Sequence, residues 1–362
     1  MKEVLIHLKK LDWVMILVAA ILVGIGLLSI YSSSHGNFLN FKKQVFFFLV
    51  GFFLMILVSF FDWRILKENP YLILFFYFLC LFLLAGVLLF APTIRGIKSW
   101  FKIGLFSFDP REFTKIVLLL LLAKYFTMRH AEMYRISNII ISGLYVGLPS
   151  FLSFLQPDLG SVLIFIAIWV YILFLSGIKL RHFFLLVILA IALFSLGWAK
   201  FFKEYQKERI LSFILPQISD PLKIGWSQNQ SKIAIGSGGI FGKGIGKGSQ
   251  TQLGFLPAPQ TDFIFASIAE ETGFLGVSLI FVLYSILIWR IVKISLSQRA
   301  NFARIFTLGF SALLVSQIFV HIGSNIGILP VVGIALPFLS YGGSCLIAHF
   351  IGLGIVQSMK TH

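Results

Sequence analysis

The sequence predicts an all-α, polytopic membrane protein with about ten transmembrane helices. Hydrophobic residues make up 58% of the 362 residues, charged residues make up only 12%, and the mean hydropathy is +0.95. An average soluble domain carries about 25% charged residues. Apolar runs near the ~20 residues that cross a bilayer recur along the chain, and they must be helices because an open sheet cannot satisfy its backbone in lipid. We therefore expect a single membrane domain, 1–362.

The first predicted span follows Lys9 and Lys10, and no small-residue cleavage pattern closes it. We interpret it as an uncleaved helix and not as a removed signal. In chain order, the ten predicted spans are 12–33, 43–61, 70–91, 111–128, 136–154, 158–177, 180–200, 263–290, 303–323 and 334–358.

Local signals predict several helix ends. Asp109, Pro110 and Glu112 match an N-cap, a first-turn proline and a capping-box partner. Gln156-Pro157-Asp158 marks the break between the fifth and sixth spans. Residues 324–344 are rich in Gly and Pro and carry no charge, so this connection is expected to dip back into the membrane-facing surface.

The distribution of basic residues predicts the orientation. With the N-terminus inside, the inner connections carry half of the 30 Lys and Arg residues, whereas the short outer connections 155–157 and 324–333 carry none. An even number of spans places both termini in the cytoplasm. The other basic residues lie mainly around 91–115 and in a large outer loop, 201–262. An anionic ligand would explain this surface, and attraction to anionic lipid headgroups is the alternative.

The segment 225–254 sets Lys232, Lys243 and Lys247 among closely spaced glycines. Glycine allows backbone N–H groups to turn toward an anion, although a flexible surface loop explains the same composition. The segment fits neither GxxxxGK[ST] nor a GxGxxG turn after a strand, which disfavours ATP chemistry.

Two polar groups flank the third and fourth spans. Arg95, Lys98 and Lys102 surround Trp100. The Trp is either a membrane anchor or a platform that stacks on a sugar or lipid headgroup while the cations hold phosphate. Glu112 and Lys115 are three residues apart, so they share a helix face and are expected to form an ion pair. The pair is either structural or lines a cavity.

Asp262 is the strongest candidate for catalysis. It stands where the basic, glycine-rich segment meets an apolar helix, and on a helix it would face nearly the same way as Glu270. A charge at a helix N-terminus is favourable by up to ~1 kcal/mol, but that does not explain the basic segments on both sides. We therefore expect Asp262 to act in catalysis or substrate contact.

The sequence gives no metal-ligand pattern. Cys80 and Cys345 form no CxxC, and the histidines form no HxxH or HxxxH pair. We interpret the cysteines as core residues and expect no metal cage built from protein ligands alone.

Taken in order, the motifs resemble those of the SEDS family of shape, elongation, division and sporulation proteins, especially the members that act in cell elongation. The resemblance covers nearly the whole chain. It rests on RGIKSWFKIG (95–104), PREFTK (110–115), QPDLGS (156–161), ERILSFI (208–214), Asp220-Pro221, the segment 225–257, TDFIFASIAEETG (261–273) and LPFLSYGGS (336–344).

This resemblance implies a peptidoglycan glycosyltransferase that polymerises lipid II at the outer face of the bacterial cytoplasmic (inner) membrane. It also implies a complex with a class B penicillin-binding transpeptidase and other elongation-complex proteins. The matching positions imply that Asp262 is the essential acid, and that further family positions are Trp100, Glu112, Lys115, Asp158, Arg209 and Gln230.

Two motifs depart from the family pattern. The family's Gln-Pro-Ser-Glu is Asp109-Pro110-Arg111-Glu112 in this chain. Its Pro-Glu-x-His-Thr-Asp is the segment 257–262, with Ala258 and Gln260 in place of Glu and His. Asp262 therefore lacks two of its usual companions.

Polymerisation requires a base for the acceptor hydroxyl and positive charge for the lipid pyrophosphate that leaves. We expect Asp262 to be the base and Arg95, Lys98, Arg209, Lys232 or Lys243 to offset the pyrophosphate charge. A divalent cation, Mg²⁺ or Mn²⁺, stays open, and no nucleic-acid partner is expected. The alternatives are a flippase for lipid-linked precursor in which Asp262 couples protons, and a non-catalytic scaffold that docks a transpeptidase.

Overall fold

The computed structural model describes residues 2–91, 100–104, 106–129, 136–201, 207, 211 and 224–362. Each of the ten predicted spans contains a helix. The helices are α1 (Lys2–Lys10), α2 (Trp13–Ser32), α3 (Leu39–Phe60), α4 (Arg64–Glu68), α5 (Pro70–Phe90), α6 (Pro110–Met128), α7 (Ile136–Leu155), α8 (Leu159–Leu175), α9 (Leu180–Leu196), the π-helix η2 (Gly197–Phe201), α11 (Ile224–Ser237), α12 (Ser249–Gln252), α13 (Ile264–Ser297), α14 (Asn301–Ile326) and α15 (Gly343–Thr361).

Within the described residues, seven helices are long and apolar enough to cross a membrane: α2, α3, α5, α7, α9 with η2, α13 and α14. The apolar helix α8 is shorter, and α6 and α15 are 19 residues each. The predicted all-α membrane fold is thus confirmed. The number of ten crossings remains a prediction.

Some boundaries differ from the prediction. The last helix begins at Gly343 and not at 334, since the connection before it is irregular. A two-stranded antiparallel hairpin, β1 (Phe101–Ile103) and β2 (Phe106–Phe108), precedes α6. The region 201–262, expected as a large loop, contains α11 and α12. The last helix starts late because Pro330, Gly333 and Pro337 interrupt the apolar run, whereas the other two differences lie where apolar runs are short.

The predicted capping box at α6 is half right. Asp109 is the N-cap and accepts a hydrogen bond from the Arg111 N–H at 3.0 Å. In a capping box, Glu112 would accept from the Asp109 N–H. That N–H donates instead to Ser344 Oγ at 2.9 Å, and Glu112 pairs with Lys115. The start of α6 is therefore joined to the start of α15.

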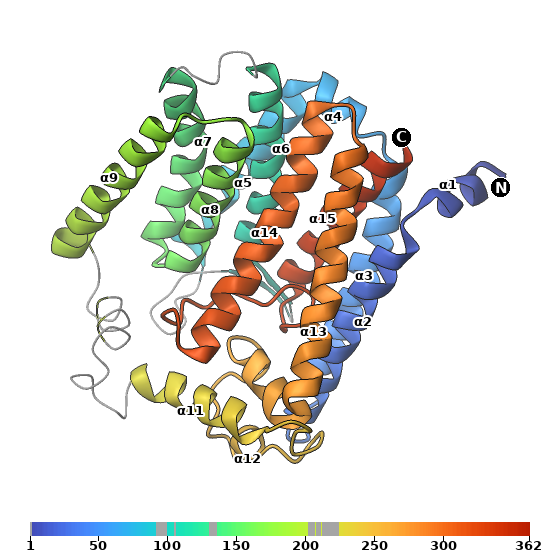
Figure 1. Ribbon diagram of the computed structural model, residues 1–362, viewed down its shortest axis with the longest axis vertical. Coiled ribbons are helices and arrows are strands. Elements are labelled where there is room, and N and C mark those ends of the chain that lie inside the picture. Colours follow the sequence, from blue (N-terminus) through green and yellow to red (C-terminus); the bar gives the residue numbers. More distant parts are fainter. Residues whose placement is uncertain are drawn as a thin grey trace.

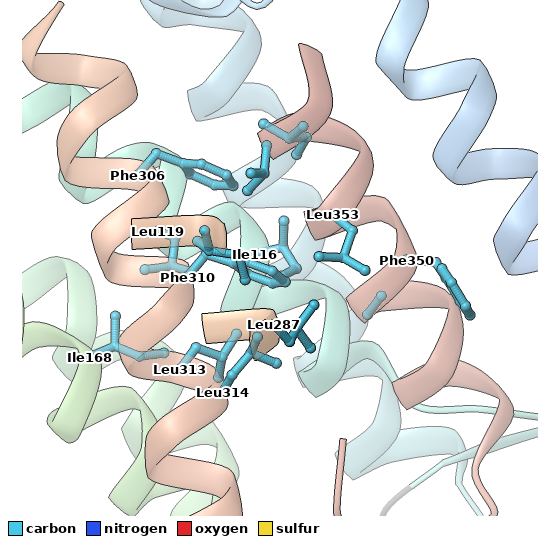
Figure 2. Close-up of a cluster of buried hydrophobic side chains, with 14 of the residues drawn as sticks. Ile116, Leu119, Ile168, Leu287, Phe306, Phe310, Leu313, Leu314, Phe350 and Leu353 are labelled. Atoms are coloured by element: carbon cyan, nitrogen blue, oxygen red, sulfur yellow. The ribbon is translucent and has the colours of Figure 1, made fainter. Parts of the chain in front are cut away.

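The hydrophobic core is centred on α14, which packs against α6, α8 and α13. Figure 2 shows side chains of these helices and α15 meeting around Phe306 and Phe310, both fully buried. Burial of such side chains contributes roughly 1.5–3 kcal/mol each. By contrast, α9 stands away from the bundle in Figure 1, and residues such as Phe184 and Ile188 remain more than half exposed along it, as lipid contact requires.

The helix bundle has two ends, which lie at the top and bottom of Figure 1. Both termini lie at one end, where the rings of His7 and His362 are 5.6 Å apart. There the buried Asp12, N-cap of α2, forms salt bridges with Arg290 at 2.6 Å and with Lys360 at 3.4 Å. The helices α11 and α12 lie at the opposite end, together with the start of α13.

Candidate active site

Asp262 lies in the turn that leads into α13, not on the helix itself. Helix α13 begins at Ile264 with Phe263 as its N-cap. Within the turn, the N–H groups of Thr261 and Phe263 both donate to the carbonyl of Ala258 (3.1 and 3.3 Å), which has a φ of +43°. The expectation that Asp262 and Glu270 share a helix face is therefore wrong, because the helix starts two residues after Asp262. Asp262 itself is half-buried.

Three consecutive carbonyls of this turn are held from outside. The Tyr341 N–H donates to the Gln260 carbonyl at 2.8 Å, Ser340 Oγ donates to the Thr261 carbonyl at 3.0 Å, and Asn325 Nδ2 donates to the Asp262 carbonyl at 2.9 Å. We call these three donors and Gln260 the Asp262 clamp. Asn325 and Ser340 are buried, so water competes little for these bonds.

The glycine-rich segment is packed against α13. Helix α13 breaks at Gly273 (φ +66°), and beyond the break the N–H groups of Phe274 and Leu275 donate to the carbonyls of Gly239 and Ile240. At Gly242 (φ +78°) a Cβ would overlap the main-chain oxygen of Glu271. The glycines here allow two backbones to approach each other closely.

The anions bound by this segment belong to the chain itself. The Glu270 carboxylate is fully buried and accepts bonds from the N–H groups of Gln250 (2.8 Å) and Thr251 (3.0 Å), and from Thr251 Oγ1 (2.9 Å). Lys243 Nζ completes the site at 3.0 Å. The Glu271 carboxylate accepts from Ser32 Oγ and from the Gly246 N–H at 3.1 Å. Lys243 therefore has an intramolecular partner in this structure.

The predicted ion pair of Glu112 and Lys115 is confirmed at 2.6 Å, and both side chains are largely buried. In the described part of the chain, one group of three His, Cys, Asp or Glu side chains could hold a metal ion: Glu112, Cys345 and His349. Its ligand set mixes oxygen, sulfur and nitrogen, which suits zinc better than Mg²⁺ or Mn²⁺. Lys115 already occupies one Glu112 oxygen, and His349 Nδ1 lies 2.6 Å from the Cys345 carbonyl.

That group does not include Asp262. A Mg²⁺ or Mn²⁺ ion at Asp262 would therefore need ligands beyond a described protein group of three, such as substrate phosphates or water.

Asp158 caps a helix and forms an ion pair within the chain. It is the N-cap of α8 and accepts bonds from the Ser161 N–H (3.2 Å) and Ser161 Oγ (2.7 Å). The buried Arg111 guanidinium bridges it to Asp109. This gives one departure from the family pattern a structural role, since Arg111 links α6 to α8 by pairing with Asp158 as well as with Asp109.

The remaining predicted residues lie apart. Lys232 is exposed on α11 and its side chain lies over Gly327 at the end of α14, while Gln230 is half-buried on the same helix. Trp100 is half-buried just before β1. Arg95, Lys98 and Arg209 lie outside the described residues.

The uncharged connection between α14 and α15 brings several of these parts together. Beyond its bonds to the Asp262 turn, its Leu329 carbonyl accepts from Gln228 on α11 at 2.8 Å. A Cβ on Gly160, at the start of α8, would lie 2.7 Å from the Val332 oxygen. The sequence indicated this connection only as an apolar segment, and Asn325 and Ser340 were missed because single polar residues in such a segment have no spacing signature.

A cavity of about 360 Å³ borders the Asp262 turn. Its lining includes Gln260 and Thr261 of the turn, together with His35, Asn40 and Tyr341. These lining side chains are neutral or weakly basic hydrogen-bonding groups and an aromatic ring.

The fold and the site together define the class of protein. It is a polytopic helical membrane protein that holds an acid, Asp262, in a hydrogen-bonded turn at one end of the helix bundle. Residues 12–362 match the family model FTSW_RODA_SPOVE, cell cycle protein, and the chain belongs to this family. It is 36% identical over 353 residues to peptidoglycan glycosyltransferase MrdB of Escherichia coli (strain K12), covering 97% of this chain and 94% of that protein. It is 32% identical over 363 residues to stage V sporulation protein E of Bacillus subtilis (strain 168), covering 97% of each.

Solved structures agree with this assignment. The chain superposes on a chain from a peptidoglycan synthase complex with a TM-score of 0.82, at 31% identity and 97% coverage of both. For the rod shape determining protein RodA of Thermus thermophilus the TM-score is 0.72, at 30% identity and with 97% and 96% coverage.

Proposed function

We propose that this protein is a peptidoglycan glycosyltransferase that polymerises lipid II during cell elongation, with Asp262 as the general base. The observation that carries the proposal is the Asp262 clamp. It fixes the main chain around Asp262, at one end of the helix bundle, through three successive carbonyls. A catalytic base requires such a fixed position. The name of the E. coli relative supports the reaction type.

In the proposed reaction, a hydroxyl of the acceptor sugar attacks the anomeric carbon of the donor, and the bond to the lipid pyrophosphate breaks. The Asp262 carboxylate takes the hydroxyl proton, and basic side chains offset the charge of the leaving pyrophosphate. One base and no covalent intermediate predicts inversion at the anomeric carbon, by analogy with inverting hydrolases.

Arg95, Lys98, Arg209 and Lys232 are the proposed pyrophosphate contacts, with Trp100, Glu112, Lys115, Asp158 and Gln230 around the substrate. Lys243 is a weaker member of this set, because its Nζ already pairs with Glu270. The neutral cavity beside the Asp262 turn suits a sugar better than a phosphate, since sugars are bound by hydrogen bonds and aromatic faces.

We further propose that the end with α11 and α12 faces the outside of the inner membrane and that both termini are cytoplasmic. The basic connections at the termini support this orientation. We propose a class B penicillin-binding transpeptidase as the partner, in line with the structural neighbour from a peptidoglycan synthase complex.

Transport of the precursor coupled to protons at Glu270 or Glu271 fits the structure less well. The two acids of α13 that could couple protons, Glu270 and Glu271, are occupied by hydrogen bonds that fix the glycine-rich segment. A coupling site must release its proton to water in one state, and these bonds would have to break to allow it.

The test uses the purified chain with its transpeptidase partner and lipid II in detergent. We expect glycan polymer from the wild type and none from Asp262→Asn. A scaffold predicts that Asp262→Asn supports growth as long as the complex assembles. Absence of polymer from the wild type, together with lipid II movement across sealed vesicles, would overturn the proposal in favour of transport.

A further inference from the structure

We propose that Gln260 is a positioning residue that fixes the Asp262 carboxylate by tying its turn to the corner between α2 and α3. The inference rests on the proposed function of Asp262. It concerns the position where this chain departs from the His of the family pattern, and it gives that position a mechanical role in place of a chemical one.

Both ends of the Gln260 amide are used. Nε2 donates to the Ser33 carbonyl at 3.2 Å, and Oε1 accepts from Asn40 Nδ2 at 2.8 Å. Ser33 is the C-cap of α2 and is buried, and Asn40 is in the first turn of α3. The main-chain carbonyl of Gln260 accepts from Tyr341. Gln260, two residues before Asp262, thus connects the turn to Ser33, Asn40 and Tyr341, which are all distant from it in sequence.

The other clamp bonds cannot replace this hold. Ser340 and Asn325 both belong to the α14–α15 region, so they restrain the turn from that region. Only the Gln260 side chain, among the clamp contacts found in the described residues, restrains it from the α2–α3 corner. The turn also borders the 360 Å³ cavity, which leaves it room to shift if the amide is removed.

A side-chain amide does not titrate near neutral pH, so Gln260 cannot act as an acid or a base and affects the rate only through geometry. A displacement of about 1 Å at a reacting group costs up to about 100-fold in rate. Neutral histidine carries one N–H donor and one acceptor nitrogen, the same pair that Gln260 uses toward Ser33 and Asn40. Histidine at this position is therefore expected to restore the hold.

The experiment compares Gln260→Ala and Gln260→His with the wild type, each purified with the transpeptidase partner. The matched control is Gln298→Ala, which removes a glutamine that donates to the Met359 carbonyl at 2.8 Å at the opposite end. The measurements are kcat and KM for lipid II, the pH dependence of kcat, and hydrogen exchange of the amides of 258–263.

We expect Gln260→Ala to lower kcat about 10- to 100-fold with KM changed less than about threefold, to leave the pH dependence unchanged, and to speed amide exchange in 258–263. Gln260→His should recover most of kcat, and Gln298→Ala should match the wild type. If Gln260→Ala does not fold, Asn40→Ala removes only the bond to Oε1 and should show the same changes to a smaller degree.

A wild-type kcat or wild-type exchange in Gln260→Ala would overturn the inference, as would a shifted pH profile, which would mean a chemical role. Failure of the proposed function is separate: the wild type would then make no glycan, while the exchange measurement would still test whether Gln260 holds the turn.

Discussion

The two ends of the helix bundle stabilise their acids in different ways. At the end with the chain termini, Asp12 is neutralised by Arg290 and Lys360, so charge meets charge. At the other end, most of the bonds to Glu270 come from backbone N–H groups and a hydroxyl, and the Asp262 turn is held by neutral donors at its carbonyls. Lys243 is a charged partner of Glu270, but hydrogen bonds from uncharged groups supply most of the described contacts at this end.

The largest expected effect separates the two aspartates. Asp262→Asn should lower polymerisation about 10²- to 10⁴-fold, because the general base is lost while the shape is kept, and the thermal midpoint should stay the same. Asp12→Asn should instead lower the thermal midpoint and leave polymerisation unchanged. It loses charge-assisted hydrogen bonds worth about 1.5–3 kcal/mol but leaves the Asp262 turn intact. Both are measured by glycan polymerisation and thermal unfolding in detergent. Equal losses of activity in the two variants would remove the distinction.

A second substitution tests the close approach at the α11–α12 end. Gly242→Ala places a Cβ against the Glu271 oxygen at a φ of +78°. Backbone strain and overlap together are expected to destabilise the protein by about 2–5 kcal/mol. Gly239→Ala is the control, because it has a φ of +56° with nothing within 4 Å and carries the strain alone. Equal thermal midpoints for the two variants would show that the packing against α13 matters little.

The charged end predicts a pH dependence. Burial acts to raise the pKa of Asp12, but the hydrogen bonds from Arg290 and the Met15 N–H and the charges of Lys360 and Arg290 together outweigh it, and the pKa lies below its usual value. Because the pKa of Asp12 is lower in the folded chain than in the unfolded chain, its carboxylate stabilises the folded state at pH values above about 4. This stabilisation is lost as the pH falls through the folded-state pKa. The difference in thermal midpoint between wild type and Asp12→Asn should therefore shrink below about pH 4. A difference that does not shrink at all as the pH falls below about 4 would contradict this.

The smallest effects distinguish two lysines. Lys243→Ala removes one partner of the buried Glu270, which keeps its other hydrogen bonds, and should cost about 1 kcal/mol of stability. Lys232→Ala removes an exposed side chain and should change stability by less than about 0.5 kcal/mol. If Lys232 contacts pyrophosphate, its variant raises the KM for lipid II instead. Thermal unfolding and KM together assign each lysine to structure or to substrate.

Part of the site was predictable because its signals are local. The spacing of Glu112 and Lys115 on one helix predicted their ion pair, and Asp109 and Asp158 stand at the helix starts that the prolines mark. The break of α13 at Gly273 and the hydrogen bonds of the Gln260 side chain were not predictable. Both depend on backbone groups that come from segments distant in sequence.

By itself, the sequence determined the membrane class, the helices within all ten predicted ranges and the position of Asp262 at the start of an apolar helix. Apolar run length and helix-start signals are properties of neighbouring residues, so no tertiary information was needed. Only the tertiary structure decided that the glycines serve close packing, that Lys243 belongs to Glu270, and that three carbonyls around Asp262 are clamped. Each of these is a contact across long sequence separation, between polar groups whose partners depend on how the helices pack.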